Sequence, residues 1–207
     1  MKSILSCLFV ALTSSLVGCR PAASKALLQP SEALGTVLAR ETARLAGPKK
    51  TVAIISPDAS WGPTSTAETA FVAELKRAGV KPLAAKAANV GDPMRSGEVG
   101  LRAADLFEVL DKFKDAGAVV SFAGTPLLKP ADRARLATDH PPIVVVATAS
   151  LGTVPGVPGD RMQLATLLDA KLVRMAVIDG QDPSVGPGQD SAGHEFSSKY
   201  RILRAAD

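Results

Sequence analysis

The chain of 207 residues has few of the residue types on which nucleic-acid recognition depends. It contains one Trp and one Tyr, and aromatic residues make up 4% of it, which leaves little surface on which bases could stack. Lys and Arg number 24 against 20 Asp and Glu, and they are spread along the chain rather than gathered in a basic patch. We therefore expect no nucleic-acid partner. The hydrophobic fraction of 46% in turn excludes a disordered chain.

Motifs for catalysis are also absent. The sequence has no Gly-x-Ser-x-Gly elbow, no Gly-x-x-x-x-Gly-Lys phosphate loop and no Gly-x-Gly-x-x-Gly dinucleotide motif. Its two histidines are His140, expected on the surface before a strand, and His194, in a Gly- and Pro-rich region that would not align a base. Four carboxylates recur at a spacing typical of a solvated helix face: Asp105, Glu108, Asp111 and Asp115. We expect neither an enzyme nor a cofactor or metal site.

The first residues have the layout of an export signal. A positively charged start, Met1-Lys2-Ser3, precedes an apolar run over residues 4–12 that is too short to span a membrane. The residues that follow at the processing site, Leu16-Val17-Gly18-Cys19, resemble the lipobox of bacterial lipoproteins. The resemblance implies that a signal peptide, residues 1–18, is removed and that the Cys19 thiol is lipidated. The alternative is an ordinary signal peptide in which the cysteine occurs by chance.

Lipidation would attach the protein to a membrane while the domain itself stays in water. Two or more acyl chains such as palmitate anchor a protein stably, at about 0.8 kcal/mol per buried CH₂. Arg20 follows the cysteine, and in lipoproteins an Asp there tends to cause retention at the inner membrane, so Arg20 favours the outer membrane where two membranes exist. Cys7 lies in the signal and Cys19 is consumed by the lipid, so no thiol remains for a disulfide, a metal site or catalysis. We therefore expect the protein to be located in the cell envelope, anchored by lipid on the periplasmic side.

Strands and helices alternate after a linker over residues 19–30. Continuous apolar runs predict five strands, at 51–56, 80–85, 118–122, 143–147 and 172–178. Helices are predicted around them, with Ser31 as the N-cap of the first, from Ser31 to about Gly47 and then at 64–78, 101–116, 130–138 and 160–170. This alternation predicts a three-layer α/β/α sandwich with a mainly parallel sheet of about five strands over residues 31–179. Residues 180–207 are expected to form a flexible Gly- and Pro-rich tail, in which 195–203 could add an edge strand or a helix.

The loops after the strands hold the candidate ligand site, because open parallel sheets bind ligands outside the carboxyl ends of their strands. The loop after the first strand contains Asp58, Ser60 and Trp61, followed by hydroxyl residues at a helix start that would suit an anion or a carboxylate. Thr125 and Ser150, in two later loops, complete the set of candidates. In the alternative, Trp61 packs on its own helix, the hydroxyls only cap it, and Thr125 belongs to an ordinary loop.

The run from Lys50 to Gly62 resembles a recurring segment of type I periplasmic ligand-binding proteins, of the type that serves branched-chain amino acid ABC transporters. In that family a basic residue and a β-run are followed by an Asp, an aromatic residue and a Gly that opens a helix. Residues 71–81 and 110–120 are similar to later parts of the same family, and the likeness covers about residues 49–152. The resemblance implies one lobe of such a protein, with the five candidate residues at the edge of its cleft.

Members of that family hold their ligand between two lobes, whereas the mature chain has room for one. Either a second subunit, as in a homodimer, supplies the other wall, or the fold no longer binds solutes. The first case predicts a lipid-anchored, non-catalytic solute-binding or sensing module for a small polar ligand such as an amino acid. The second predicts an envelope lipoprotein that keeps the fold and binds another protein.

Overall fold

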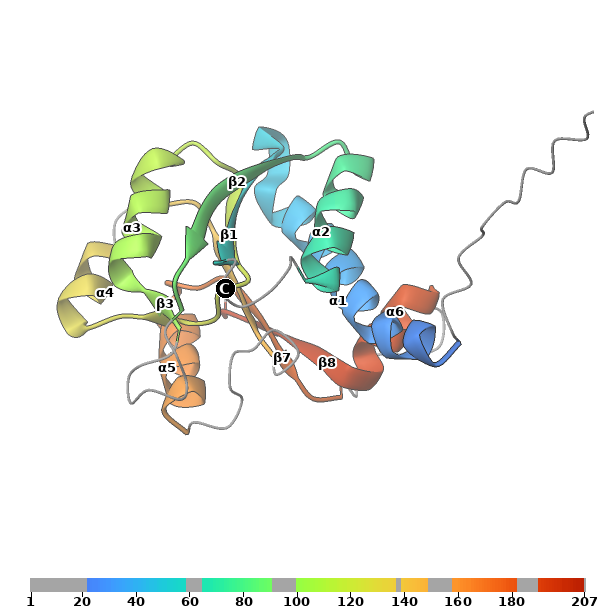
Figure 1. The fold of residues 1–207 in the computed structure, drawn as a ribbon. Helices are drawn as coiled ribbons and strands as arrows, with labels where there is room; N and C mark the ends of the chain where they lie inside the picture. Colours follow the sequence, from blue (N-terminus) through green and yellow to red (C-terminus); the bar gives the residue numbers. More distant parts are fainter. Residues whose placement is uncertain are drawn as a thin grey trace, which may run out of the picture.

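The computed structural model describes residues 22–58, 65–90, 100–136, 139–148, 158–181 and 190–206. The predicted signal peptide and its processing site at Cys19 lie outside these ranges. All the helices and strands discussed below belong to the described residues, and Figure 1 shows how they are arranged.

The centre of the molecule is a six-stranded sheet with the order β2-β1-β4-β6-β7-β8. The first five strands are parallel, and β8 runs antiparallel to β7 at one edge. Their bounds are β1 Thr51–Pro57, β2 Lys81–Ala88, β4 Ala118–Ser121, β6 Ile143–Ala147, β7 Met175–Asp179 and β8 Tyr200–Arg204. The inner strands are continuous apolar runs because both faces of the sheet are covered, as parallel sheets require.

Helices cover both faces, which confirms the predicted three-layer α/β/α sandwich. Alternate residues of β1 show the two faces: Val52 and Ile54 pack with one helix layer, and Ala53 and Ile55 pack with the other. The first layer contains α1 Ala22–Ala46, α2 Thr66–Arg77 and α6 Ser191–Lys199. The second contains α3 Ala103–Lys112, α4 Pro130–Leu136 and α5 Pro158–Asp169. A short 3₁₀ helix, Gly47–Lys49, and a small sheet of β3 Leu101–Arg102 and β5 Pro126–Leu127 complete the described elements.

The first helix begins earlier than the sequence predicts. It starts at Ala22 rather than at Ser31, so Ser31 is an interior residue and not the N-cap, and the segment predicted as a linker is helical from Ala22 on. The segment from Ala22 to Gln29 is rich in Ala, Leu, Lys and Gln, which are strong helix formers. The helix propensity of these residues outweighs the loss of stability caused by the hydrogen bond that Pro30 removes from the interior of the helix.

The end of the chain is also folded rather than a flexible tail from residue 180 on. Asp190 caps α6, since its Oδ1 accepts the Gly193 N–H at 2.9 Å, and its Oδ2 lies 2.5 Å from Nη1 of Arg40 in α1. The chain then continues directly into β8, whose Ile202 packs with the first helix layer while Leu203 packs with the second. The sequence left open whether residues 195–203 add an edge strand or a helix, and the structure contains both α6 and β8 there. The sheet therefore has six strands instead of about five. Residues 182–189 lie outside the described residues.

One carboxylate of the predicted solvated helix face is buried. Asp105 of α3 is 5% exposed, and its oxygens lie 3.0 Å from Lys86 Nζ of β2 and 2.8 Å from Arg102 Nε. Burial alone would raise the pKa of Asp105, but the hydrogen bonds from Lys86 and Arg102 outweigh it and hold the pKa below its ordinary value. This side chain therefore ties α3 to the edge of the sheet.

Candidate functional site

The candidate site lies where the carboxyl ends of β1 and β4 meet. The chain passes from β1 outward to β2 and then crosses to β4 on the other side of β1, so the order of the sheet reverses between β1 and β4. Such a switch point is where open α/β sheets bind ligands, because the connections leave it in opposite directions and open a crevice. Polar residues lie at the end of both strands: Ser56 is the next-to-last residue of β1, Asp58 follows β1 directly, and Thr125 lies in the loop after β4.

Ser56 and Glu68 form a partly buried polar pair at the carboxyl end of β1. Ser56 is half-buried and follows the buried residues 52–55 of β1, and its Oγ donates a hydrogen bond of 2.5 Å to Oε1 of Glu68, in the first turn of α2. Glu68 is 8% exposed, and this burial raises the pKa of its carboxyl, which the hydrogen bond from Ser56 opposes. A carboxyl in this setting can accept a hydrogen bond when ionised and donate one when protonated.

The sequence around Glu68 has the Ser-x-x-Glu pattern of a capping box. Ser65 is the N-cap of α2, and its Oγ accepts the Glu68 N–H at 3.1 Å. In a capping box the Glu side chain would return to the Ser65 N–H. Here it bonds to Ser56 instead, so the carboxyl belongs to the end of the sheet rather than to the helix terminus.

Thr125 supplies the second buried polar group at this edge. It is 2% exposed, and its Oγ1 has no hydrogen-bond partner among the described residues. The surrounding backbone is tightly packed, because a Cβ at Gly100 would lie 3.0 Å from the Thr125 carbonyl oxygen and Ser121 Oγ donates to the Gly124 carbonyl at 2.9 Å. An unsatisfied buried hydroxyl costs about 1–3 kcal/mol, which a ligand or a water bonded to it would recover.

The structure describes two residues of the predicted set, Asp58 and Thr125, and places them on opposite sides of β1. Asp58 is half-buried, and its backbone N–H donates to the Ala88 carbonyl at 2.9 Å, which places it beside the end of β2. Thr125 lies at the end of β4 on the other side of β1. The other predicted ligand residues, Ser60, Trp61 and Ser150, lie outside the described residues.

Two residues of the site were not predicted as ligand-binding residues. Ser56 reads as the last member of an apolar strand, and Glu68 reads as an ordinary polar residue in the first turn of a helix. The capping-box spacing from Ser65 to Glu68 is a signal that draws attention to this turn, although it predicts a different partner for the carboxyl. Across the part of the chain that the structure describes, no three His, Cys, Asp or Glu side chains gather in a group that could hold a metal ion.

No protein-family model matches the chain, and no curated protein matches its sequence. Among the described residues, none of the helices combines the length and the apolar character needed to cross a membrane.

Proposed function

We propose that the protein is a lipid-anchored, non-catalytic binding module of the cell envelope that takes a small polar solute, such as an amino acid, at the carboxyl edge of β1 and β4. The observation that carries the proposal is the buried Thr125 hydroxyl, which lacks a partner among the described residues. It follows the strand next to β1, where the Ser56–Glu68 pair lies. A solute with both donor and acceptor groups would satisfy the hydroxyl and the carboxyl together.

A single lobe supplies only one wall of such a site. Ligand pockets normally bury 70–90% of a small ligand, and we propose that a second subunit, as in a homodimer, supplies the other wall of the site. The need for this second wall distinguishes the proposal from the alternative, in which the same fold binds another envelope protein and no solute.

The position of α1 supports an anchored domain held close to the membrane. Cys19 lies three residues before Ala22, where α1 begins, and three extended residues span at most about 11 Å. The first turns of α1 lie beside α6, at the opposite side of the molecule from α3 and α4 (Figure 1). An anchor at Cys19 would therefore leave the α3–α4 side turned away from the bilayer.

Thermal denaturation of the full chain in a panel of amino acids and other small polar solutes tests the binding proposal. We expect at least one solute to raise the melting temperature of the wild type. Thr125→Val keeps the shape of the side chain but removes the hydroxyl, so it should abolish the shift caused by that solute. A panel in which no solute changes the melting temperature contradicts solute binding and favours the protein-binding alternative.

Thr42→Val is the matched control. Thr42 of α1 is also fully buried, and its Oγ1 also lacks a partner among the described residues, but it lies on the helix and not at the carboxyl edge. Both substitutions should leave the free protein as stable as before or more stable, because each removes an unsatisfied hydroxyl. Only Thr125→Val should remove the response to the solute. Equal responses in the two variants would show that Thr125 does not contact it.

The anchor is tested separately by labelling cells with radioactive palmitate. The wild-type protein should incorporate label and should have a mass that corresponds to cleavage before Cys19 with lipid attached. Cys19→Ser should incorporate none. Unlabelled wild-type protein with residues 1–18 still in place would contradict the anchor and leave the solute-binding proposal standing on its own test.

A further inference from the structure

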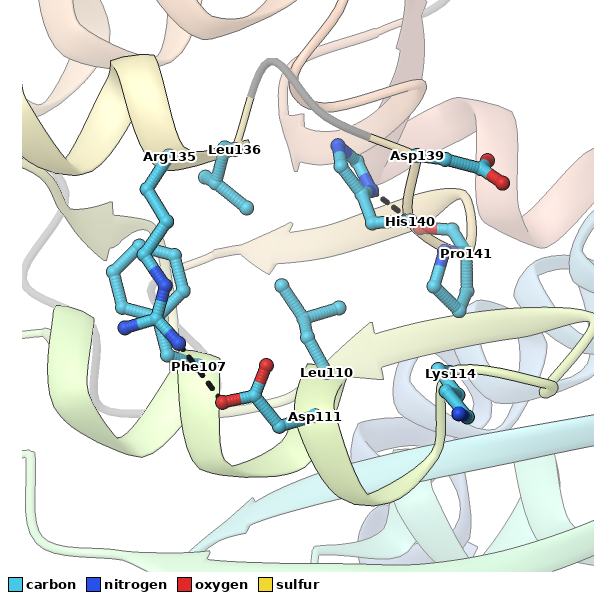
Figure 2. A pocket seen from close by; sticks show the side chains of 9 residues that line it. All are labelled: Phe107, Leu110, Asp111, Lys114, Arg135, Leu136, Asp139, His140 and Pro141. Atoms are coloured by element: carbon cyan, nitrogen blue, oxygen red, sulfur yellow. Dashed lines mark hydrogen bonds and ion pairs between the residues drawn. The ribbon is translucent and has the colours of Figure 1, made fainter.

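A pocket of about 280 Å³ lies at the amino end of β6, whereas the candidate site lies at the carboxyl ends of the strands. It is formed where α3 and α4 end and where the chain enters β6. Figure 2 shows the side chains of Leu110 and Leu136 pointing toward one another across its middle, with Phe107 on one side and Pro141 on the other. The pocket therefore has an apolar interior that suits a hydrocarbon body.

One of the two carboxylates at the pocket is already neutralised. The guanidinium of Arg135 lies over the Phe107 ring, 4.0 Å from its centroid, and its Nη2 lies 2.8 Å from Oδ2 of Asp111. The cation–π contact and the ion pair hold both charged groups in place at the wall. Asp111 is therefore compensated within the wall and does not set the charge preference of the pocket.

The second carboxylate, that of Asp139, is directed away from the middle of the pocket in Figure 2. Its orientation removes it as a partner for a group bound between Leu110 and Leu136. A bound cation would therefore find no open carboxylate in the interior of the pocket.

Lys114 and His140 remain at the rim. The Lys114 ammonium has no hydrogen bond or ion pair with any described residue, although it lines the pocket. His140 is fixed because its Nδ1–H donates to the Pro141 carbonyl at 2.8 Å, which leaves Nε2 for another partner. An adjoining depression shares the Phe107–Arg135 wall and is also lined by Arg102, which pairs with Asp105, and by Lys129 and Asp132, which carry opposite charges. Among the described residues that line the pocket itself, Lys114 is thus the cation that no carboxylate compensates.

We propose that this pocket binds a small organic monocarboxylate with a branched or aromatic body. The body would lie between Leu110 and Leu136, and the carboxylate would pair with the Lys114 ammonium at the rim. This site is separate from the carboxyl edge and does not depend on the proposed solute binding there. If Cys19 anchors the chain, the pocket lies on the side of the molecule turned away from the membrane.

Isothermal titration of the full chain with benzoate tests the site, with benzamide as the neutral isostere. Benzoate should bind saturably, and benzamide should bind about fivefold more weakly, the effect expected from one solvent-exposed ion pair. Raising the salt concentration should weaken benzoate binding and leave benzamide binding unchanged. No saturable benzoate binding, or equal affinity for the two compounds, overturns the proposal.

Two lysines that lie two residues apart give a matched pair of variants. Lys114→Gln should weaken benzoate binding about fivefold. Lys112→Gln removes the same charge two residues earlier, where the ammonium lies 5.3 Å from the Phe113 ring centroid and not at the pocket, and it should leave the affinity unchanged. Thr125→Val should also leave it unchanged, because the carboxyl edge is a different site. Equal effects of Lys114→Gln and Lys112→Gln, or loss of binding in Thr125→Val, would contradict the placement in this pocket.

Discussion

The crossing of α1 and α2 depends on the absence of a side chain at Gly35. A Cβ at this position would lie 2.1 Å from the Ala67 carbonyl oxygen, 2.8 Å from the Phe71 nitrogen and 2.9 Å from the Ala70 Cβ. The nearest two of these atoms belong to the backbone of α2, which cannot move aside as a side chain can. Gly35→Ala would therefore force the two helices apart by roughly 1 Å at this point, as ordinary packing distances require.

Two opposing effects set the magnitude. Helix propensity alone favours Ala over Gly by about 1 kcal/mol in a helix interior. Forcing extra volume into a packed interface costs typically 1–3 kcal/mol and occasionally more. Because the obstacle is backbone, we expect the cost of packing to prevail, so that Gly35→Ala lowers the free energy of unfolding by about 2 kcal/mol. The displacement includes the turn that holds Glu68, so solute binding at the carboxyl edge should weaken as well.

Urea denaturation of the full chain, followed by far-UV circular dichroism, measures this change. Thr36→Ala is the control on the same helix, since Thr36 is only half-buried and its Oγ1 bonds to the Glu32 carbonyl of its own helix. It should change the free energy of unfolding by no more than about 0.5 kcal/mol. A Gly35→Ala protein that is more stable than the wild type by about 1 kcal/mol would show that propensity governs and that α1 and α2 are not in close contact.

Two further predictions concern carboxylates whose pKa the fold displaces. Burial raises the pKa of Glu68, so ionisation of this carboxyl opposes folding. The wild-type protein should therefore lose stability relative to the Glu68→Gln variant as the pH rises from about 4.5 through the folded-state pKa of Glu68. Melting temperatures of the two proteins should converge at about pH 4 and differ most at about pH 8, and the reverse trend would contradict the burial of this carboxyl. The Gly193 N–H and Arg40 lower the pKa of Asp190, so its stabilising effect should be complete above the ordinary value of 3.8 and be lost as the pH falls through the folded-state pKa. At neutral pH, Asp190→Ala should lower the free energy of unfolding by about 1 kcal/mol, because the variant loses the N-cap of α6. Asp190→Asn keeps the acceptor oxygen and should lower it by less. Equal losses in the two variants, measured by urea denaturation, would show that the cap contributes nothing.

The interior of the sheet could be predicted from the sequence because its strands are continuous apolar runs. The strand expected over residues 143–147 is β6 residue for residue, and that expected over 118–122 differs from β4 only at its last position. Helix ends were less predictable. The helix expected from Leu101 begins at Ala103, because Leu101 and Arg102 instead pair with Pro126 and Leu127 as a short strand. That pairing joins residues far apart in the sequence, and no local pattern indicates it.

Apolar periodicity therefore determined the class of the fold, since runs buried on both faces and separated by amphipathic helices can pack only as a covered parallel sheet. The lipobox-like residues at Cys19 are likewise a property of the sequence alone. The tertiary structure decided which polar side chains are buried. Glu68 and Asp105 both occupy the first turn of a helix, where a carboxylate is ordinarily solvated, yet Glu68 meets Ser56 and Asp105 meets Lys86 on strands that come from elsewhere in the chain. Whether a charged side chain is buried depends on what packs opposite it, and that is fixed only when distant segments assemble.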